Sequence, residues 1–256
     1  MPPRSSGRSR LPDQPSPECP PGIYLVATPI GNLRDITLRA LDVLRSVHVI
    51  AAEDTRKTLI LLRHFNLTKR VIAFHAHNEQ RAVDGIINLV RTGQAVAVVT
   101  DAGTPGIADP GYSIVRAAQT AAIPVTLIPG PTAFVAALVL SGLPSHSFIF
   151  RGFPPHRSGQ RRRYFADDAQ QPYTLIYYES PHRLSAFLHD AVAIFGNRQA
   201  AIASELTKYY ERIQCGTLSE LSQHIAENTP RGEFTIIVAG CLRERTRSDR
   251  ATEEYG

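Results

Sequence analysis

Residues 100–111 form the segment of the chain whose composition is best suited to binding a ligand. Their sequence is TDAGTPGIADPG, with three glycines, and they directly follow the continuous apolar run 95–99. Glycine lets the backbone approach a ligand closely, and open α/β folds bind ligands at the carboxyl ends of their strands. We therefore predict a binding loop here, with a tight structural turn as the alternative. Neither a Gly-Lys-Ser/Thr ending nor a G-x-G-x-x-G spacing occurs in the segment, which disfavours ATP hydrolysis and ordinary NAD binding.

Two further loops have the same character. Residues 28–32 (TPIGN, including Pro29 and Gly31) follow the apolar run 23–26, and residues 129–132 (PGPT) follow the run 125–128. Three stiffened, glycine-bearing loops at strand ends can line one crevice, where their backbone groups bind a ligand without a phosphate-binding lysine. Together they favour a nucleoside-like cofactor.

Three glutamates close other predicted strands, and each is a candidate proton acceptor. They are Glu179, Glu53 and Glu205, in the order in which we rank them. A carboxylate beside a bound substrate acts as a general base or accepts a hydrogen bond from a substrate hydroxyl. The alternative for each is a cap, a salt bridge to a nearby arginine or a solvated loop carboxylate.

A basic loop, residues 154–163, is the candidate surface for a polyanion. It contains Arg157, Arg161, Arg162 and Arg163, and the whole chain has a net charge of +5. Arginines beside glycine in a flexible loop suit phosphate contacts, and a merely solvated surface is the alternative. Six aromatic residues are candidates to stack on bases, although aromatic residues that alternate along strands more often belong to a core; they are Tyr164, Phe165, Tyr177, Tyr178, Tyr209 and Tyr210.

Metal and thiol chemistry have little support. His75 and His77 would share a strand face, but no third ligand is suitably placed, so we expect hydrogen bonding and no metal. The three cysteines match neither a disulfide framework nor a C-x-x-C pattern, which favours a reducing, cytoplasmic compartment. No apolar run approaches the roughly 20 residues needed to cross a bilayer, so we expect no membrane association.

The elements that must position these residues form an α/β protein. Hydrophobic content is 43% with 20% charged residues, as in globular domains. Proline-rich residues 1–21 and charged residues 243–256 predict disordered tails around two domains, 22–146 and 147–242. The first alternates five strands (23–26, 47–52, 71–74, 95–99, 125–128) with helices, which include one capped by Asp35 or Thr37 and others at 78–93, 112–121 and 133–141. The second has strands at 147–150, 174–178, 200–204, 209–214 and 234–238. Two of these are consecutive, which predicts a mixed sheet.

Long, ordered motifs lie between residues 22 and 240: VATPIGNL (26–33), AEDTR (52–56), HNE (77–79), DAGTPGI (101–107), PGPTA (129–133), YESPHR (178–183) and ELTK (205–208). Together they resemble the tetrapyrrole methylase superfamily, and within it the enzymes that modify small-subunit ribosomal RNA. The sequence departs from this pattern at Ser204, where relatives commonly have arginine. The resemblance implies two α/β domains of the tetrapyrrole methylase type, with the cofactor in the cleft between them.

The same resemblance implies an S-adenosylmethionine-dependent enzyme that methylates the ribose 2′-hydroxyl of a cytidine in the decoding region of 16S ribosomal RNA. Its partners would be small-subunit RNA or the small ribosomal subunit and a second copy of the chain, with Arg183 near the RNA phosphates. Together with the loop at Gly31, it predicts cofactor contacts from Pro29, Asp101, Ala102, Gly103, Thr104, Ile107, Thr132, Ala133, Tyr178, Leu206 and Thr207. A methyltransferase acting on a tetrapyrrole and a non-catalytic RNA-binding protein are the alternatives.

Overall fold

The structure is a computed structural model that describes residues 18–75, 78–228, 230 and 232–241. Most of the predicted N-terminal tail (residues 1–17), the predicted tail 243–256 and His77 lie outside the described residues. The described chain divides into two compact units. Unit 1 contains residues 18–27, 36–101 and 110–129, and unit 2 contains residues 28–35, 102–109 and 130–241. The boundary at residue 146 between two independently folding domains stays a prediction.

Unit 1 is built on the parallel sheet that the alternation of strands and helices predicted. Its strand order is β3-β2-β4-β1-β5, and all its strand pairs are parallel. The strands are β1 (Gly22–Val26), β2 (Val49–Ala52), β3 (Arg70–Ala73), β4 (Ala95–Val99) and β5 (Val125–Ile128). Both β1 and β4 are buried along their whole length, which confirms the interpretation of residues 95–99 as a strand covered on both faces.

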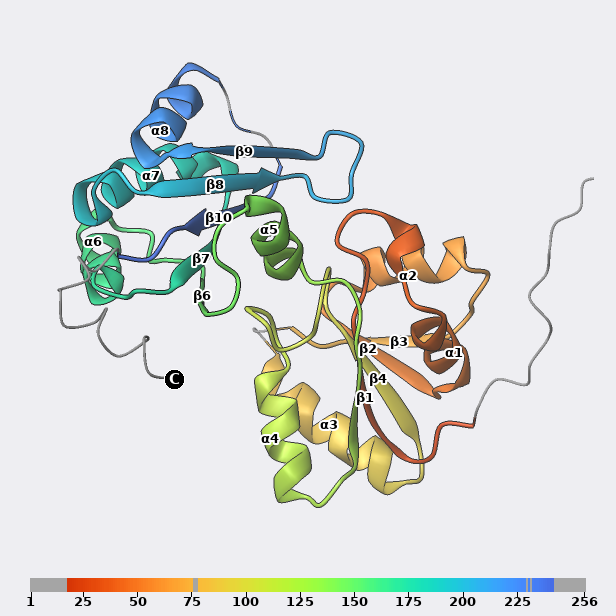
Figure 1. The fold of residues 1–256 in the computed structure, drawn as a ribbon. Helices are drawn as coiled ribbons and strands as arrows, with labels where there is room; N and C mark the ends of the chain where they lie inside the picture. The colour runs from red at the N-terminus through yellow and green to blue at the C-terminus, as the bar shows by residue number, and fades with distance from the viewer. Residues whose placement is uncertain (1–17, 76–77, 229, 231, 242–256) are drawn as a thin grey trace, which may run out of the picture. The chain divides into compact units, whose positions relative to one another are not determined.

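Four helices cover the two faces of this sheet. Helices α3 (Glu79–Arg91) and α4 (Tyr112–Thr120) pack on one face, and α1 (Leu38–Ser46) and α2 (Thr55–His64) cover the other (Figure 1). Thr37 caps α1, because its hydroxyl accepts a hydrogen bond from the Ala40 amide at 3.1 Å. Helix α2 was not predicted from the sequence. Its local signal is Asp54, whose carboxylate accepts a hydrogen bond from the Arg56 amide at 2.8 Å and caps the helix.

Unit 2 is built on a mixed sheet, as predicted, and its strand order is β6-β7-β10-β8-β9. Only β6 and β7 pair in parallel. The strands are β6 (Phe148–Gly152), β7 (Thr174–Glu179), β8 (Gln199–Ser204), β9 (Arg212–Thr217) and β10 (Phe234–Val238). The prediction that a strand begins at Tyr209 is wrong. Turns in which the Lys208 amide donates to Glu205 O and the Glu211 amide donates to Lys208 O occupy that segment instead, so β9 begins at Arg212.

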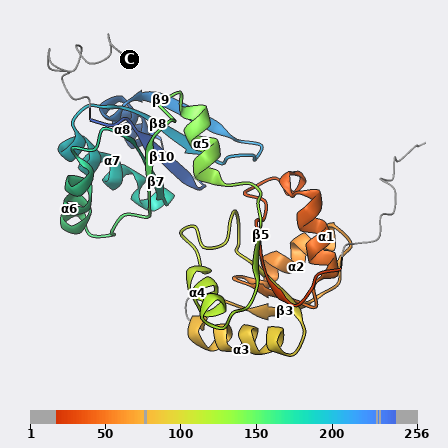
Figure 2. The ribbon, with the colours of Figure 1, turned by 60° about the horizontal axis from the view of Figure 1, so that its bottom comes forward.

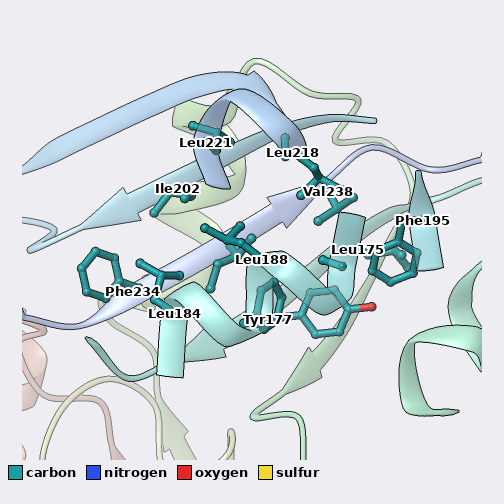
Figure 3. Close-up of a cluster of buried hydrophobic side chains, with 14 of the residues drawn as sticks. Leu175, Tyr177, Leu184, Leu188, Phe195, Ile202, Leu218, Leu221, Phe234 and Val238 are labelled. Atoms are coloured by element: carbon teal, nitrogen blue, oxygen red, sulfur yellow. The ribbon is translucent and has the colours of Figure 1, made fainter. Parts of the chain in front are cut away.

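Helices also cover both faces of this second sheet. Helix α5 (Ala133–Ser141) packs on one face, against residues such as Ile176, Ala201 and Ile237. Helices α6 (Ser158–Asp168), α7 (Pro181–Phe195) and α8 (Leu218–Glu227) pack on the other (Figure 2). The core under these three helices brings Tyr177 and Ile202 from the sheet against Leu188 of α7 (Figure 3). In the part of the chain that the structure describes, no helix has the length and apolar character to cross a membrane.

Helix α6 corrects the prediction of a basic loop at residues 154–163. The helix begins at Ser158, so Arg161, Arg162 and Arg163 are helical. Arginine has a high helix propensity, and the run continues into Phe165, which is fully buried in the core of unit 2. The absence of Gly-Pro punctuation after Gly159 is the local signal that favours a helix.

Candidate functional site

Three of the predicted loops leave the carboxyl ends of three neighbouring strands. In the order β4-β1-β5, the strands lie side by side and point the same way. The segments that follow them therefore start from one edge of the sheet, as the sequence predicted. Most of each segment groups with unit 2: residues 28–35, 102–109 and those from Gly130 onward. We call residues 28–32, 102–109 and 130–133 the loop platform.

Hydrogen bonds join the three parts of the loop platform. The Thr28 amide donates to Gly103 O at 2.9 Å, and the Gly103 amide donates to Thr28 O at 3.0 Å. The hydroxyls of Thr104 and Thr132 lie 2.9 Å apart and are hydrogen-bonded. Gly103 has φ +82°, which a side chain disfavours. The structure thus brings together the three loops that the sequence analysis assigned to one ligand, and it joins them through backbone groups at Thr28 and Gly103 and through hydroxyls at Thr104 and Thr132.

A fourth segment, residues 205–208, packs directly on the loop platform at Gly31. A β-carbon at Gly31 would lie 2.6 Å from Cγ of Lys208, 2.7 Å from Leu206 O and 2.8 Å from Oγ1 of Thr207. Real β-carbons essentially never come so close to other heavy atoms. The glycine is therefore required for this approach, which links the motif at 28–32 to the motif at 205–208.

The segment 205–208 has a strained backbone and an unused polar atom. Glu205 has φ 49° and Thr207 has φ 65°, and for a β-branched residue such as threonine this region is a true outlier. The Thr207 amide donates to Oε2 of Glu211 at 2.6 Å, which helps to hold the turn. Oγ1 of Thr207 is buried and has no hydrogen-bond partner among the described residues. Strain and an unpaired polar atom concentrate at binding sites, where a ligand satisfies them.

Aromatic side chains surround Tyr178 at the end of β7. Its ring contacts Phe150 at 5.0 Å and Phe153 at 5.4 Å between centroids, and Phe150 stacks on Phe134 at 4.6 Å. The Phe134 amide donates to the Tyr178 hydroxyl at 3.2 Å, which ties the start of α5 to β7. Burial, with a contribution from Asp109, raises the pKa of Tyr178 to about 12, so the hydroxyl stays neutral near pH 7. The sequence analysis missed Phe150 and Phe153, although their apolar character at the end of a strand was visible.

Glu179, ranked first as a base, is buried together with Arg183. Its Oε1 accepts from the Ser180 amide at 2.8 Å, and its Oε2 lies 3.0 Å from Nη2 of Arg183. Burial raises the pKa of Glu179, although the Ser180 amide and Arg183 oppose the shift. Arg183 also donates to Pro154 O at 2.5 Å. The predicted base and the predicted phosphate ligand are thus partners of one another.

The other two glutamates are less buried than Glu179, and each has one oxygen without a hydrogen bond within the described part of the chain. Oε1 of Glu205 accepts from Nζ of Lys208 at 2.9 Å and from the Glu233 amide at 3.2 Å, which leaves Oε2. In unit 1, Oε2 of Glu53 accepts from the Asp101 amide at 3.2 Å, which leaves Oε1. Glu205 belongs to the segment that packs on the loop platform.

Asp101 is held from within unit 1. Its Oδ1 accepts from the Asp54 amide at 3.0 Å, and its Oδ2 accepts from Nζ of Lys57 at 2.7 Å. Hydrogen bonds from Arg56 hold the pKa of the neighbouring Asp54 well below its usual range. Asp101 therefore anchors the beginning of the loop 102–109 with a carboxylate that already has two donors.

The basic residues of α6 divide into buried and exposed ones. Arg161 is 2% exposed, and it donates to Oδ2 of Asp190 through Nε at 2.9 Å and through Nη2 at 2.6 Å. Arg162 is exposed and reaches the other oxygen of Asp190 at 3.2 Å. Arg157 and Arg163 are exposed. We therefore withdraw Arg161 from the predicted phosphate contacts, because its guanidinium joins α6 to α7.

The chain is similar in sequence to known proteins over most of its length. The family model described as "Tetrapyrrole (Corrin/Porphyrin) Methylases" matches residues 22–222. The chain is 49% identical over 224 residues to the "Ribosomal RNA small subunit methyltransferase I" of Xylella fastidiosa, covering 86% of this chain and 82% of that protein. It is 46% identical to the proteins of the same name from Micromonospora olivasterospora (90% and 74% covered) and Synechocystis sp. (87% and 80% covered).

A solved structure has the same fold. It is the uroporphyrin-III-C-methyltransferase of Thermus thermophilus, which matches with a TM-score of 0.59 and covers 85% of this chain and 93% of that one. Sequence identity is 22%, so this likeness concerns the fold alone.

Proposed function

Because this chain belongs to the tetrapyrrole methylase family, we propose that it is a small-subunit ribosomal RNA methyltransferase that methylates the ribose 2′-hydroxyl of a cytidine in the decoding region of 16S RNA. The observation that carries the proposal is 46–49% identity to proteins named ribosomal RNA small subunit methyltransferase I, over at least 86% of this chain. The alternative of a tetrapyrrole substrate is supported by a structure only 22% identical, whose likeness reaches no further than the fold.

The loop platform and the segment 205–208 fit S-adenosylmethionine, which supplies an electrophilic methyl group on a sulfonium when bound. This cofactor has no phosphate, and the platform is made of backbone groups, hydroxyls and small residues rather than a lysine-bearing P-loop. The unpaired Oγ1 of Thr207 and the Tyr178 hydroxyl offer polar contacts. The residues that hold the cofactor are Pro29, Gly31, Ala102, Gly103, Thr104, Ile107, Thr132, Ala133, Tyr178, Leu206 and Thr207, with Asp101 anchoring the central loop.

The protein's own contribution to the reaction is alignment and acceptance of a proton. Holding two reactants in a reactive geometry removes a large part of the entropic barrier. A ribose hydroxyl is a far weaker acid than a carboxylic acid, so a carboxylate is an effective acceptor only if it is already hydrogen-bonded to the hydroxyl. Of the three glutamates, Glu205 combines a free oxygen with a place beside the loop platform. It is now the first candidate, followed by Glu53.

Glu179 acts through Arg183 as a positioning residue, because its side chain is buried, one of its oxygens accepts from the Ser180 amide and the other lies against the Arg183 guanidinium. Single-turnover methylation of each Glu→Gln variant separates these roles. Glu205→Gln lowers the rate roughly 10²-fold at unchanged cofactor affinity if Glu205 accepts the proton. Glu227→Gln, on the exposed surface of α8, is the matched control. Near-normal rates in all three glutamine variants would mean that water takes the proton.

Arginines of α6 and α7 bind the phosphates of the RNA. The exposed Arg157, Arg162 and Arg163 lie on or next to α6, and the partly buried Arg183 lies in the first turn of α7. Arg162 and Arg183 each keep donors beyond those used in their ion pairs, since a guanidinium has five. Guanidinium groups match phosphate oxygens in a bidentate geometry, which suits this role.

The decisive experiment maps ribose methylation in small-subunit RNA by mass spectrometry. RNA from cells that lack this protein is expected to lose one 2′-O-methylcytidine, and the purified protein with S-adenosylmethionine restores it on isolated small subunits. If the purified protein methylates naked RNA but not isolated small subunits, its substrate is the RNA before the subunit is assembled. If the protein binds the cofactor but methylates no ribosomal RNA, the tetrapyrrole alternative gains support; if it binds only RNA, it is a non-catalytic RNA-binding protein.

The chain works as a homodimer in the bacterial cytoplasm, where its ribosomal substrate is made. Support for self-association comes from α5, a helix without charged residues, on which Val135, Val139 and Leu140 remain exposed. Exposed apolar side chains that gather on one helix mark association surfaces. Sedimentation of the wild type and of Val139→Glu tests this: a dimer that the substitution dissociates is expected, and a monomeric wild type would contradict it.

A further inference from the structure

The structure sorts the aromatic residues that the sequence marked as candidates for base stacking. Phe165 and Tyr177 are fully buried in the core of unit 2. Tyr164 is partly buried, with the Arg151 guanidinium 4.1 Å from its ring centroid. Tyr209 and Tyr210 differ from all of these, because they are 93% and 78% exposed. They lie in the connection between β8 and β9, which extends beyond the ends of both strands (Figure 1).

The backbone that carries the two tyrosines is fixed by hydrogen bonds within the connection. The Lys208 amide donates to Glu205 O at 3.0 Å, and the Glu211 amide donates to Lys208 O at 3.1 Å. The Thr207 amide donates to the Glu211 carboxylate on the far side of the tyrosines. The rings contact each other edge to face, with centroids 4.9 Å apart. An aromatic pair is therefore presented to solvent on a backbone that is already ordered, which lowers the entropic cost of binding to it.

One cation beside the pair is available to a phosphate. Arg212, the first residue of β9, is exposed and has no ion-pair partner in the part of the chain that the structure describes. The neighbouring carboxylates already accept hydrogen bonds, Glu205 from Lys208 and the Glu233 amide, and Glu211 from the Thr207 amide. The accessible groups at this end of β9 thus include two aromatic rings and one guanidinium.

We propose that Tyr209 and Tyr210 form a stacking platform for an unpaired base of the RNA substrate, with Arg212 on a neighbouring phosphate. This inference rests on the proposed function and adds to it a site for substrate recognition. Aromatic faces bind single-stranded RNA by stacking on bases, with arginine on the backbone. The pair begins two residues after Thr207, so a base held here lies on the same turn as the segment assigned to the cofactor.

The test compares three variants in methylation of small ribosomal subunits taken from cells that lack the protein. The double variant Tyr209→Ala/Tyr210→Ala loses the contribution of base stacking to RNA affinity. It is therefore expected to lower kcat/KM about 10-fold or more, mainly through KM. Tyr209→Phe/Tyr210→Phe keeps the ring faces and is expected to stay within about 2-fold of the wild type. Tyr112→Ala, which removes a 72% exposed tyrosine from α4 in unit 1, is the matched control.

Two further readouts distinguish stacking from other roles. The tyrosine rings carry no charge and neutralise no phosphate, so the alanine variant is expected to keep the wild-type salt dependence of RNA affinity. Arg212→Ala removes one charged contact and is expected to flatten that dependence by about 0.7 in log–log slope. Cofactor affinity and the thermal midpoint are expected to match the wild type, and the single variant Tyr209→Ala replaces the double one if the latter is unstable.

The outcomes separate this inference from the proposed function. A wild type that methylates no subunits contradicts the proposed function itself. If the wild type is active and the alanine variant stays within 2-fold of it, the stacking platform is wrong. If the alanine variant instead changes only the sedimentation coefficient, the pair is a contact between copies of the chain and the inference is likewise overturned.

Discussion

Gly31 and Lys208, 177 positions apart in sequence, are so close that a β-carbon on the glycine would lie 2.6 Å from Cγ of the lysine. This relationship joins two of the motifs that the sequence analysis could only name separately. It also makes Gly31 the most direct test of the site, because the obstacles to a side chain include Leu206 O, a backbone atom that cannot rotate away.

Gly31→Ala is expected to force residues 28–32 away from residues 206–208 and to weaken cofactor binding, measured by calorimetric titration with S-adenosylmethionine. The physical reason is steric, since the new carbon would also lie 2.8 Å from Oγ1 of Thr207. Gly85→Ala is the control: Gly85 lies within α3, and a β-carbon there would meet nothing within 4 Å, so this substitution should leave binding unchanged and stabilise the protein by about 0.5–1 kcal/mol. Equal cofactor affinity in both variants would contradict the site.

Replacing Thr207 by glycine should stabilise the folded protein and weaken its binding of the cofactor. Its φ of 65° costs a β-branched residue on the order of 1 kcal/mol, which Thr207→Gly relieves. Thr207→Ala keeps a β-carbon in that region and removes the hydroxyl. We expect the glycine variant to unfold at a higher denaturant concentration than the alanine variant, while both bind the cofactor more weakly than the wild type. Wild-type affinity in both would show that Oγ1 contacts no ligand.

The arginines of α6 should separate into one structural residue and several RNA contacts. Arg161→Ala leaves the buried carboxylate of Asp190 without its main partner and should destabilise the protein by about 3–5 kcal/mol in chemical unfolding. Replacing Arg157, Arg162 and Arg163 together by alanine should leave the fold intact and flatten the salt dependence of RNA affinity by up to about 2 in log–log slope. An unchanged slope would mean that these arginines are only solvated.

The raised pKa of Glu179 leads us to expect a specific pH dependence of the protein's stability. Because burial raises its pKa in the folded state, the folded protein binds this proton more tightly than the unfolded chain does. The resulting stabilisation is present below the ordinary glutamate pKa and is lost as the pH rises through the raised value. The glutamine in Glu179→Gln cannot ionise. The free energy of unfolding of this variant, relative to that of the wild type, should therefore increase between about pH 4 and pH 7. A constant difference would indicate that the Arg183 ion pair fully offsets the cost of burial.

Features that depend on local pattern could be predicted from the amino-acid sequence. Continuous apolar runs such as residues 95–99 specify strands buried on both faces, and Thr37 begins α1 because its hydroxyl satisfies a free amide in the first turn. Loops with fixed turn residues follow those strands wherever the strands pair in parallel. For this reason the parallel sheet, the mixed sheet and the positions of the three loops of the loop platform could all be predicted from the chain.

The burial of a residue could not be predicted where its neighbours in space are far away in sequence. Arg161 and Arg162 are chemically identical and adjacent, and both reach Asp190 of α7, yet Arg161 is buried between α6 and α7 whereas Arg162 remains exposed. Tyr177 and Tyr209 likewise look alike in sequence, and one packs in the core while the other lies in solvent. Periodicity describes which face of an element a residue occupies, but burial depends on what folds against that face, and that information is distributed over the whole chain.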